Sequence, residues 1–258
     1  MSENDLNPWF EMVPQSTVGK LLDPIADPLG KGIGGVASFI MNPFMKLGII
    51  NKYNMENFEK KIMEKNSSIP PENRDTSKQG LALKAVEDSI YQLDSEDLQD
   101  MFSNLIAASL DNRKNADLHP SLSTILKDFS PKDAILFKEF YRLTAIPSVT
   151  IRFQSSEKKS GINIHENILL IDGRTIIEPV ALNNLNRFGL VEIVSGIYLS
   201  STQNSLRYQQ FEESPLYLNE KAKLPVNSGE FSLDDIAVNK GKVEITSLGK
   251  LFGKTVIS

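Results

Sequence analysis

Two histidines are the only imidazole groups in the chain, which has no cysteine. A histidine that acts as a general base needs a nucleophile or a carboxylate within hydrogen-bond reach. Neither His119, which precedes Pro120 at a predicted helix start, nor His165, between Asn163 and Glu166, has such a partner at a recognisable spacing. We therefore expect His119 to cap the helix or hold the preceding loop, and His165 to be an exposed strand or loop residue.

Four carboxylates lie close together in the sequence, at Asp94, Glu96, Asp97 and Asp100. Carboxylates of this kind can bind a divalent cation, but a calcium loop also needs a glycine in mid-loop and a distal glutamate, and neither is present. Acidic residues at a helix start are stabilised by the helix dipole, which accounts for the first three carboxylates without an ion. We expect this cluster to be structural.

A glycine-rich stretch, residues 30–35, invites comparison with a phosphate-binding loop. That loop needs a lysine followed by Ser or Thr after a buried strand, whereas Lys31 is followed by glycine and no strand precedes it. We therefore predict no catalytic, cofactor-binding or metal-binding residue, no cofactor, and a protein that is not an enzyme. Carboxylate-plus-water chemistry needs neither Cys nor His, so an enzyme of unrecognised type stays open as an alternative.

The composition is that of a globular protein with one large or two small domains: 258 residues, 40% apolar and 24% charged. The absence of cysteine excludes a disulfide framework, a thiol nucleophile and cysteine-ligated metal centres. The net charge of −5 lies wholly in residues 1–146. Neither half is basic enough to favour nucleic-acid binding by charge alone.

The start of the chain is acidic and does not resemble a secretory signal. No window reaches the roughly 18 uninterrupted apolar residues that are typical of a membrane span. The nearest candidate, residues 29–50, contains two lysines, several glycines and an Asn-Pro pair. We therefore expect a cytoplasmic protein.

Helical spacing dominates the sequence up to about residue 146, after an irregular segment over residues 1–30. We expect a short helix over residues 32–41 and a second that starts at Asn42-Pro43 and reaches about Lys65. Further helices are predicted over 77–92, after the N-cap Ser95, from Pro120, and after the N-cap Ser130 up to about Thr144. Ile146-Pro147 then marks the predicted domain boundary, with a mainly helical domain over 1–146 and a second domain over 147–258.

Beyond Pro147 the apolar period changes to two, which is typical of strands. We predict strands at about 149–153, 162–171, 190–193 and 242–246, a helix over 176–188 with Gly189 at its C-terminus, and a final helix over 247–255. In that middle helix Ile177, Val180, Ala181, Leu185 and Phe188 should face inward. The fold class is therefore α+β, and the second domain is expected to be winged-helix-like, with residues 200–232 ambiguous.

Two surfaces are candidates for binding. One is an apolar set that could pack in the core, dock on a partner, self-associate or enter a bilayer on triggering: Phe39, Ile40, Phe44, Met45, Leu47, Ile49 and Ile50. The other is a nucleic-acid contact on the helix over 176–188, through Asn183, Asn184 and Arg187. A single arginine neutralises little phosphate charge, so we expect an interaction or dimerisation module there rather than a DNA reader.

The order of several segments resembles the abortive-infection alpha (Abi-alpha) family of bacterial proteins. The resemblance covers roughly residues 15–258 and rests mainly on Ile69-Pro70-Pro71-Glu72, residues 96–111, His119-Pro120-Ser121, residues 129–134, residues 185–191 and residues 245–252. It implies a cytoplasmic bacterial protein tied to phage defence, and it implies no reaction.

Our first hypothesis is therefore a non-enzymatic abortive-infection protein that acts through protein contacts or self-association, with membrane action of the apolar segment on triggering. The alternative is a cytoplasmic regulator that binds nucleic acid through the C-terminal domain.

Overall fold

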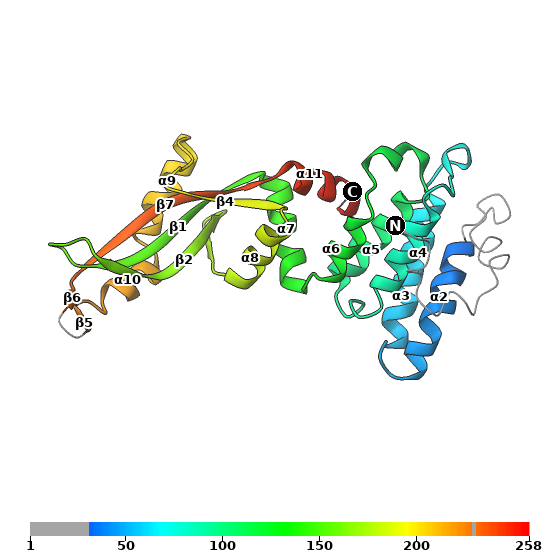
Figure 1. Cartoon of the computed structure of the whole chain (residues 1–258), viewed down its shortest axis with the longest axis horizontal. Helices are drawn as coiled ribbons and strands as arrows, with labels where there is room; N and C mark the ends of the chain where they lie inside the picture. Colours follow the sequence, from blue (N-terminus) through cyan, green and yellow to red (C-terminus); the bar gives the residue numbers. More distant parts are fainter. Residues whose placement is uncertain (1–30, 229–230, 258) are drawn as a thin grey trace, which may run out of the picture. The chain divides into compact units, whose positions relative to one another are not determined.

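The computed structural model describes residues 31–228 and 231–257 and has an α+β fold, as the sequence predicts (Figure 1). The predictions for residues 1–30 lie outside the described residues. The chain forms two compact units, which we call the helical unit (up to Ala134, and from Leu251 on) and the sheet unit (Ile135–Lys250). The units divide between Ala134 and Ile135, within a helix, and the chain end belongs to the helical unit. The domain boundary at Ile146-Pro147 stays a prediction.

The helical unit is an assembly of short amphipathic helices. Its elements are α2 (Lys31–Lys46), α3 (Lys52–Ser67), η2 (Pro71–Asn73), α4 (Gln79–Asp88), α5 (Glu96–Ala108), η3 (Asn112–Asp117) and α6 (Ser121–Lys127). Helix α3 packs between α2 and α5, and α4 packs against α5 and α6. The predicted inward face of α3 is confirmed, because Met55, Phe58 and Ile62 are buried.

The predicted helix start at Asn42-Pro43 is wrong, because α2 continues through both residues. Proline has no N–H to donate to the carbonyl oxygen four positions earlier, so α2 lacks one backbone hydrogen bond at this point. The helix ends at Lys46, and Gly48, two residues further on, has a φ of +72°, which glycine readily adopts. The Ile49 N–H donates to the Phe44 carbonyl oxygen at 2.9 Å, which is the long bond of a Schellman motif.

Side-chain caps define the helix starts that follow. The Asn51 side chain accepts from the Tyr53 N–H at 2.8 Å and opens α3. The predicted cap Ser95 opens α5. Helix α7 (Pro131–Leu143) begins after the predicted cap Ser130, where Ser130 and Asp133 exchange hydrogen bonds between side chain and backbone.

The sheet unit contains a five-stranded antiparallel sheet with the order β3-β2-β1-β7-β4. The strands are β1 (Ala145–Gln154), β2 (Gly161–Ile171), β3 (Arg174–Ile176), β4 (Val191–Ser195) and β7 (Asp235–Ile245). The helices are α8 (Pro179–Arg187), α9 (Thr202–Phe211), α10 (Pro215–Lys221) and α11 (Ser247–Val256), and β5 (Val226–Ser228) pairs with β6 (Phe231–Leu233).

The winged-helix-like arrangement is not confirmed. The segment over residues 200–233, most of which the sequence left ambiguous, carries α9, α10 and the β5–β6 hairpin, and β7 begins well before the predicted strand at 242. In α8 the buried positions Ala181 and Leu185 are as predicted, but Ile177 and Val180 are exposed and were wrongly placed inward. Ile177 precedes α8, and Val180 lies in its first turn.

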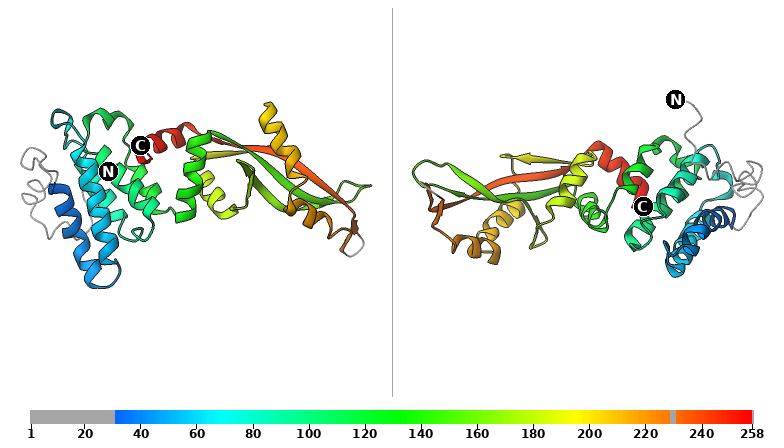
Figure 2. Two further views of the ribbon diagram at one scale, coloured as in Figure 1. Left: turned by 180° about the vertical axis from the view of Figure 1, so that it is seen from behind. Right: turned by 60° about the horizontal axis from the view of Figure 1, so that its bottom comes forward.

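Helices α9 and α10 cover one face of the sheet (Figure 2). As predicted, Val149, Ile151 and Phe153 of β1 alternate into the core on this face. They pack with Tyr208 and Phe211 of α9. The intervening residues of β1 therefore point to the opposite face, where Ile146 is buried and Thr150 is half-buried.

Candidate functional site

An apolar patch lies at the turn between α2 and α3. It consists of Phe44, Leu47, Ile49, Tyr53 and Tyr91. The side chains of Leu47, Tyr53 and Tyr91 are 74%, 72% and 69% exposed. Tyr91 belongs to the patch because its ring meets that of Phe44 edge-on, with the centroids 6.4 Å apart. A contiguous group of solvent-exposed aromatic and aliphatic side chains is typical of a binding surface.

Only some residues of the apolar set predicted from the sequence lie in this apolar patch. Leu47 and Ile49 are exposed, Ile40, Phe44 and Met45 are half-buried, and Ile50 is 4% exposed and belongs to the core. The side chain of Phe39 lies outside the described residues. Tyr53 and Tyr91 were missed, because one follows a helix cap and the other lies about 40 positions further along the chain.

Across residues 31–228 and 231–257, the helices are too short or too polar to span a membrane.

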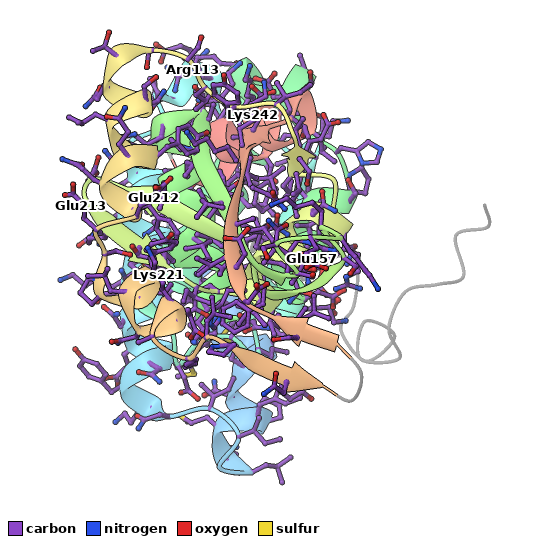
Figure 3. The ribbon with its side chains drawn as sticks, turned by 90° about the vertical axis from the view of Figure 1, so that its left-hand side faces the viewer. Arg113, Glu157, Glu212, Glu213, Lys221 and Lys242 are labelled. Carbon is purple, nitrogen blue, oxygen red and sulfur yellow. The ribbon has the colours of Figure 1, made fainter. Side chains whose placement is uncertain are left out.

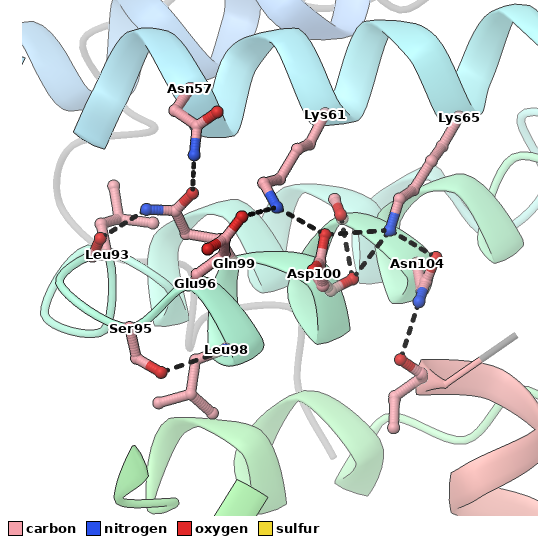
Figure 4. A network of polar contacts seen from close by, with 12 residues as sticks. Asn57, Lys61, Lys65, Leu93, Ser95, Glu96, Leu98, Gln99, Asp100 and Asn104 are labelled. Carbon is pink, nitrogen blue, oxygen red and sulfur yellow. Dashed lines mark hydrogen bonds and ion pairs between the residues drawn. The ribbon is translucent and has the colours of Figure 1, made fainter. Parts of the chain in front are cut away.

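Polar side chains form a continuous seam between α3 and α5 (Figure 4). The Lys61 ammonium lies 2.7 Å from a carboxylate oxygen of Asp100 and 3.4 Å from one of Glu96. Burial acts to lower the pKa of Lys61, but the hydrogen bonds and charges of Asp100 and Glu96 outweigh it and raise that pKa. Lys65 donates to the Asn104 side chain at 2.7 Å.

The acidic cluster is thereby divided among different partners. Asp100 and Glu96 face the lysines of α3, whereas Asp94 accepts from the Asn54 side chain at 2.8 Å. Among the described residues, no three His, Asp or Glu side chains are placed to share a metal ion. The structural role of the cluster stays a prediction.

The two histidines have different surroundings. His119 caps α6, because its Nδ1 accepts from the Ser121 N–H at 3.1 Å, which is one of the two roles predicted for it. His165 was expected to be simply exposed, but its Nε2 lies 3.1 Å from a carboxylate oxygen of Glu220, a side chain only 7% exposed. A hydrogen bond from Lys223 holds the pKa of Glu220 below its usual range against the effect of burial, with help from His165. The pairing was missed because α10 was not predicted.

The predicted nucleic-acid residues lie on α8. Asn183 and Arg187 are exposed one turn apart, whereas Asn184 is half-buried. The Arg187 guanidinium lies over the Phe188 ring, 4.5 Å from its centroid. On the α9–α10 segment Glu212 and Glu213 are exposed along with Lys221 (Figure 3), so its charge is mixed. Nucleic-acid binding through α8 stays a prediction.

Comparison with known proteins gives one structural and one family match. The search of curated proteins found no relative with significant similarity. A solved structure of an uncharacterised protein from the marine bacterium Alcanivorax borkumensis SK2 is similar over 57% of this chain and 96% of its own, with 15% identity and a TM-score of 0.34. The profile of the abortive infection alpha family matches residues 50–256, which include the segments that carry the resemblance. The chain therefore belongs to the abortive infection alpha family, whose name links it to the abortive response of bacteria to phage.

Proposed function

We propose that the protein acts in abortive phage defence in the bacterial cytoplasm, without a catalytic step of its own, by contacting a protein partner or a second copy through the apolar patch. The observation that carries the proposal is the gathering of exposed aromatic and aliphatic side chains around Leu47, Tyr53 and Tyr91. Such anchors provide much of the binding energy at protein interfaces, and tyrosine is enriched among them.

The chemistry of the patch favours a protein partner over a bilayer. Lys46 and Lys52 flank it, and Lys52 lies 3.5 Å from Glu56 in an exposed ion pair. A helix that rests on a membrane needs a broader basic face to bind anionic lipid headgroups. A tyrosine-rich patch with a rim of mixed charge is instead typical of a protein interface.

The test uses surface substitutions in the full chain and not a deletion. Removing residues 31–50 would take Ala37, Met41 and Ile50 out of the core, so loss of protection would not report on the patch. The double variant Leu47→Ser/Tyr53→Ser changes only exposed side chains. We expect it to keep the melting temperature of the parent and to lose protection, measured as efficiency of plating on phage-challenged cells.

The matched control is Val180→Ser/Leu218→Ser, which removes two exposed apolar side chains from the sheet unit. We expect this control to protect as the parent does. Full protection by the patch variant at equal expression would contradict the proposal. If the parent moves to the membrane fraction after infection and the patch variant does not, a lipid surface replaces the protein partner.

A further inference from the structure

A polar hollow lies in the sheet unit, on the sheet face opposite α9 and α10. We call it the sheet hollow; its volume is about 170 Å³. It spans β2, β1, β7 and the end of β4, and the side chains that line it are hydroxyls and amides: Ser148, Thr150, Ser195, Asn163, Asn167 and Asn239. Along β1 this face changes from buried Ile146 to Ser148 and then Thr150, so the hollow begins where the apolar part of the face ends.

The hollow exists because a glycine occupies its floor. Gly241 of β7 lies opposite Ser148 on one side and Ser195 on the other. A Cβ at this position would lie 2.8 Å from the Val194 carbonyl oxygen and 3.1 Å from Ser148 Oγ. Glycine within a strand weakens the strand, and it often marks a place that another molecule or chain approaches closely.

The pairing of β1 with β2, beside the hollow, is irregular. The pairing of β1 with β2 shifts register between Val149 and Ile151, and Asn167 has a φ of +53°. The Asn167 N–H donates to Thr150 Oγ1 at 3.3 Å, outside the regular ladder. Irregularities of this kind re-aim side chains and are frequent beside binding sites.

Ser148 is the feature that points to a ligand. The residue is 3% exposed, it lines the hollow, and no described residue forms a hydrogen bond with its hydroxyl. The hydroxyl oxygen itself is not enclosed, because it is not among the buried side-chain atoms that lack a hydrogen-bond partner in the described part of the chain. It therefore opens into the hollow, where a bound molecule can donate to it or accept from it in place of water.

The lining selects the chemistry of the ligand. The only lining residue with a charge is Lys240, and its ammonium lies over the Tyr198 and Tyr208 rings, 5.9 Å and 5.6 Å from their centroids. The hollow is lined by no aromatic residue on which a base could stack. Hydroxyl and amide side chains both donate and accept, which matches neighbouring hydroxyl groups on a small neutral molecule. We propose that the sheet hollow binds a small, neutral, polyhydroxylated molecule.

A free monosaccharide and the ribose of a nucleoside share this chemistry, and the experiment separates them. The full ¹⁵N-labelled chain is titrated with glucose and, separately, with adenosine, while amide shifts are followed by NMR. We expect saturable shifts at Ser148, Gly196 and Gly241 with at least one probe. Shifts with glucose alone indicate a free sugar, shifts with adenosine alone indicate a nucleoside, and shifts with both indicate recognition of the hydroxyl pair.

Two variants locate the binding. Ser148→Ala removes the partnerless hydroxyl and Asn239→Ala removes an amide; each should weaken binding about three- to tenfold, as expected for one hydrogen bond. Asn183→Ala, an exposed amide on α8, is the control and should leave affinity unchanged. The proposal fails if neither probe gives saturable shifts, if Ser148→Ala binds as the parent does, or if acetate or phosphate gives the same saturable shifts.

Discussion

A carboxylate in the helical unit and a hydroxyl in the sheet unit differ in how their hydrogen-bonding atoms are satisfied. In the helical unit Asp88 is 7% exposed and has three partners. Lys84 contacts its carboxylate, Ser123 Oγ donates to it at 2.7 Å, and the Lys127 ammonium lies 3.4 Å away. In the sheet unit Ser148 is 3% exposed, but its hydroxyl opens into the sheet hollow and forms no hydrogen bond with a described residue. A carboxylate satisfied within the protein fixes packing, whereas a hydroxyl that opens into a hollow is left to water or to a ligand.

The largest expected effect on stability comes from removing the Asp88 carboxylate. Asp88→Ala leaves Lys84, Ser123 and Lys127 without their common acceptor, and we expect a loss of about 2–4 kcal/mol in the free energy of unfolding. Urea denaturation measures it. Asp94→Ala, which removes an exposed carboxylate, should change stability by less than about 0.5 kcal/mol. Equal effects of the two variants would show that Asp88 does not organise this core.

A second variant tests a neutral buried group in the same unit. Gln99 is 3% exposed, donates to the Leu93 carbonyl oxygen at 2.6 Å and accepts from the Asn57 side chain at 2.8 Å. Gln99→Ala should cost about 1–3 kcal/mol, because the Leu93 carbonyl loses its partner. The urea midpoint again reports the change. An unchanged urea midpoint would show that the hydrogen bonds of Gln99 between α3 and α5 add no stability.

Lowering the pH should reduce the contribution of Asp88 to the free energy of unfolding. Burial acts to raise the pKa of Asp88, but hydrogen bonds from Lys84 and Ser123 and the charges of Lys84 and Lys127 outweigh it and lower that pKa. The stabilisation is therefore complete above the unfolded-state value of about 4 and is lost as pH falls below it. We expect the stability difference between the parent and Asp88→Ala to stay constant from about pH 6 to pH 4 and to shrink as pH falls further. A constant difference would argue against a lowered pKa.

The smallest effect should come from the hydroxyl in the sheet hollow. Ser148→Ala removes a hydroxyl that forms no hydrogen bond with a described residue, so we expect stability to change by less than about 0.5 kcal/mol. Thermal unfolding in the absence of any ligand measures it. A loss of more than about 1 kcal/mol would mean that the hydroxyl already supports the fold, and the contrast between the two units would disappear.

Local signals account for the elements that could be predicted. Ser95 and Ser130 precede helices as caps, Gly189 ends α8 with a φ of +71°, and the alternation of Val149 and Ile151 specifies β1. Each of these depends on neighbours within a few residues. The family resemblance came from the same local segments, taken in order.

The parts that were missed depend on contacts between distant residues. The local sequence at Pro43 predicts a helix start, but α2 continues through it, and Ala37 and Met41 of the same helix are buried. The polar segments that form α9 and α10 become helical with Tyr208, Phe211 and Tyr217 against the sheet. The sheet hollow needs Ser148 opposite Gly241, a pairing that joins positions far apart in the chain. A hydrophobic pattern within a few residues cannot reveal such a pairing between distant positions.

The return of the chain end to the helical unit has a consequence for biosynthesis. Phe252 and Val256 are buried, the Asn104 side chain donates to the Val256 carbonyl oxygen at 2.8 Å, and Lys254 lies 2.6 Å from Asp117. Domains usually fold in the order in which they leave the ribosome. Here the unit that is translated first lacks its last segment until the unit translated second has been made. The sheet unit can therefore complete its fold first, while part of the core of the helical unit stays exposed to chaperones and proteases.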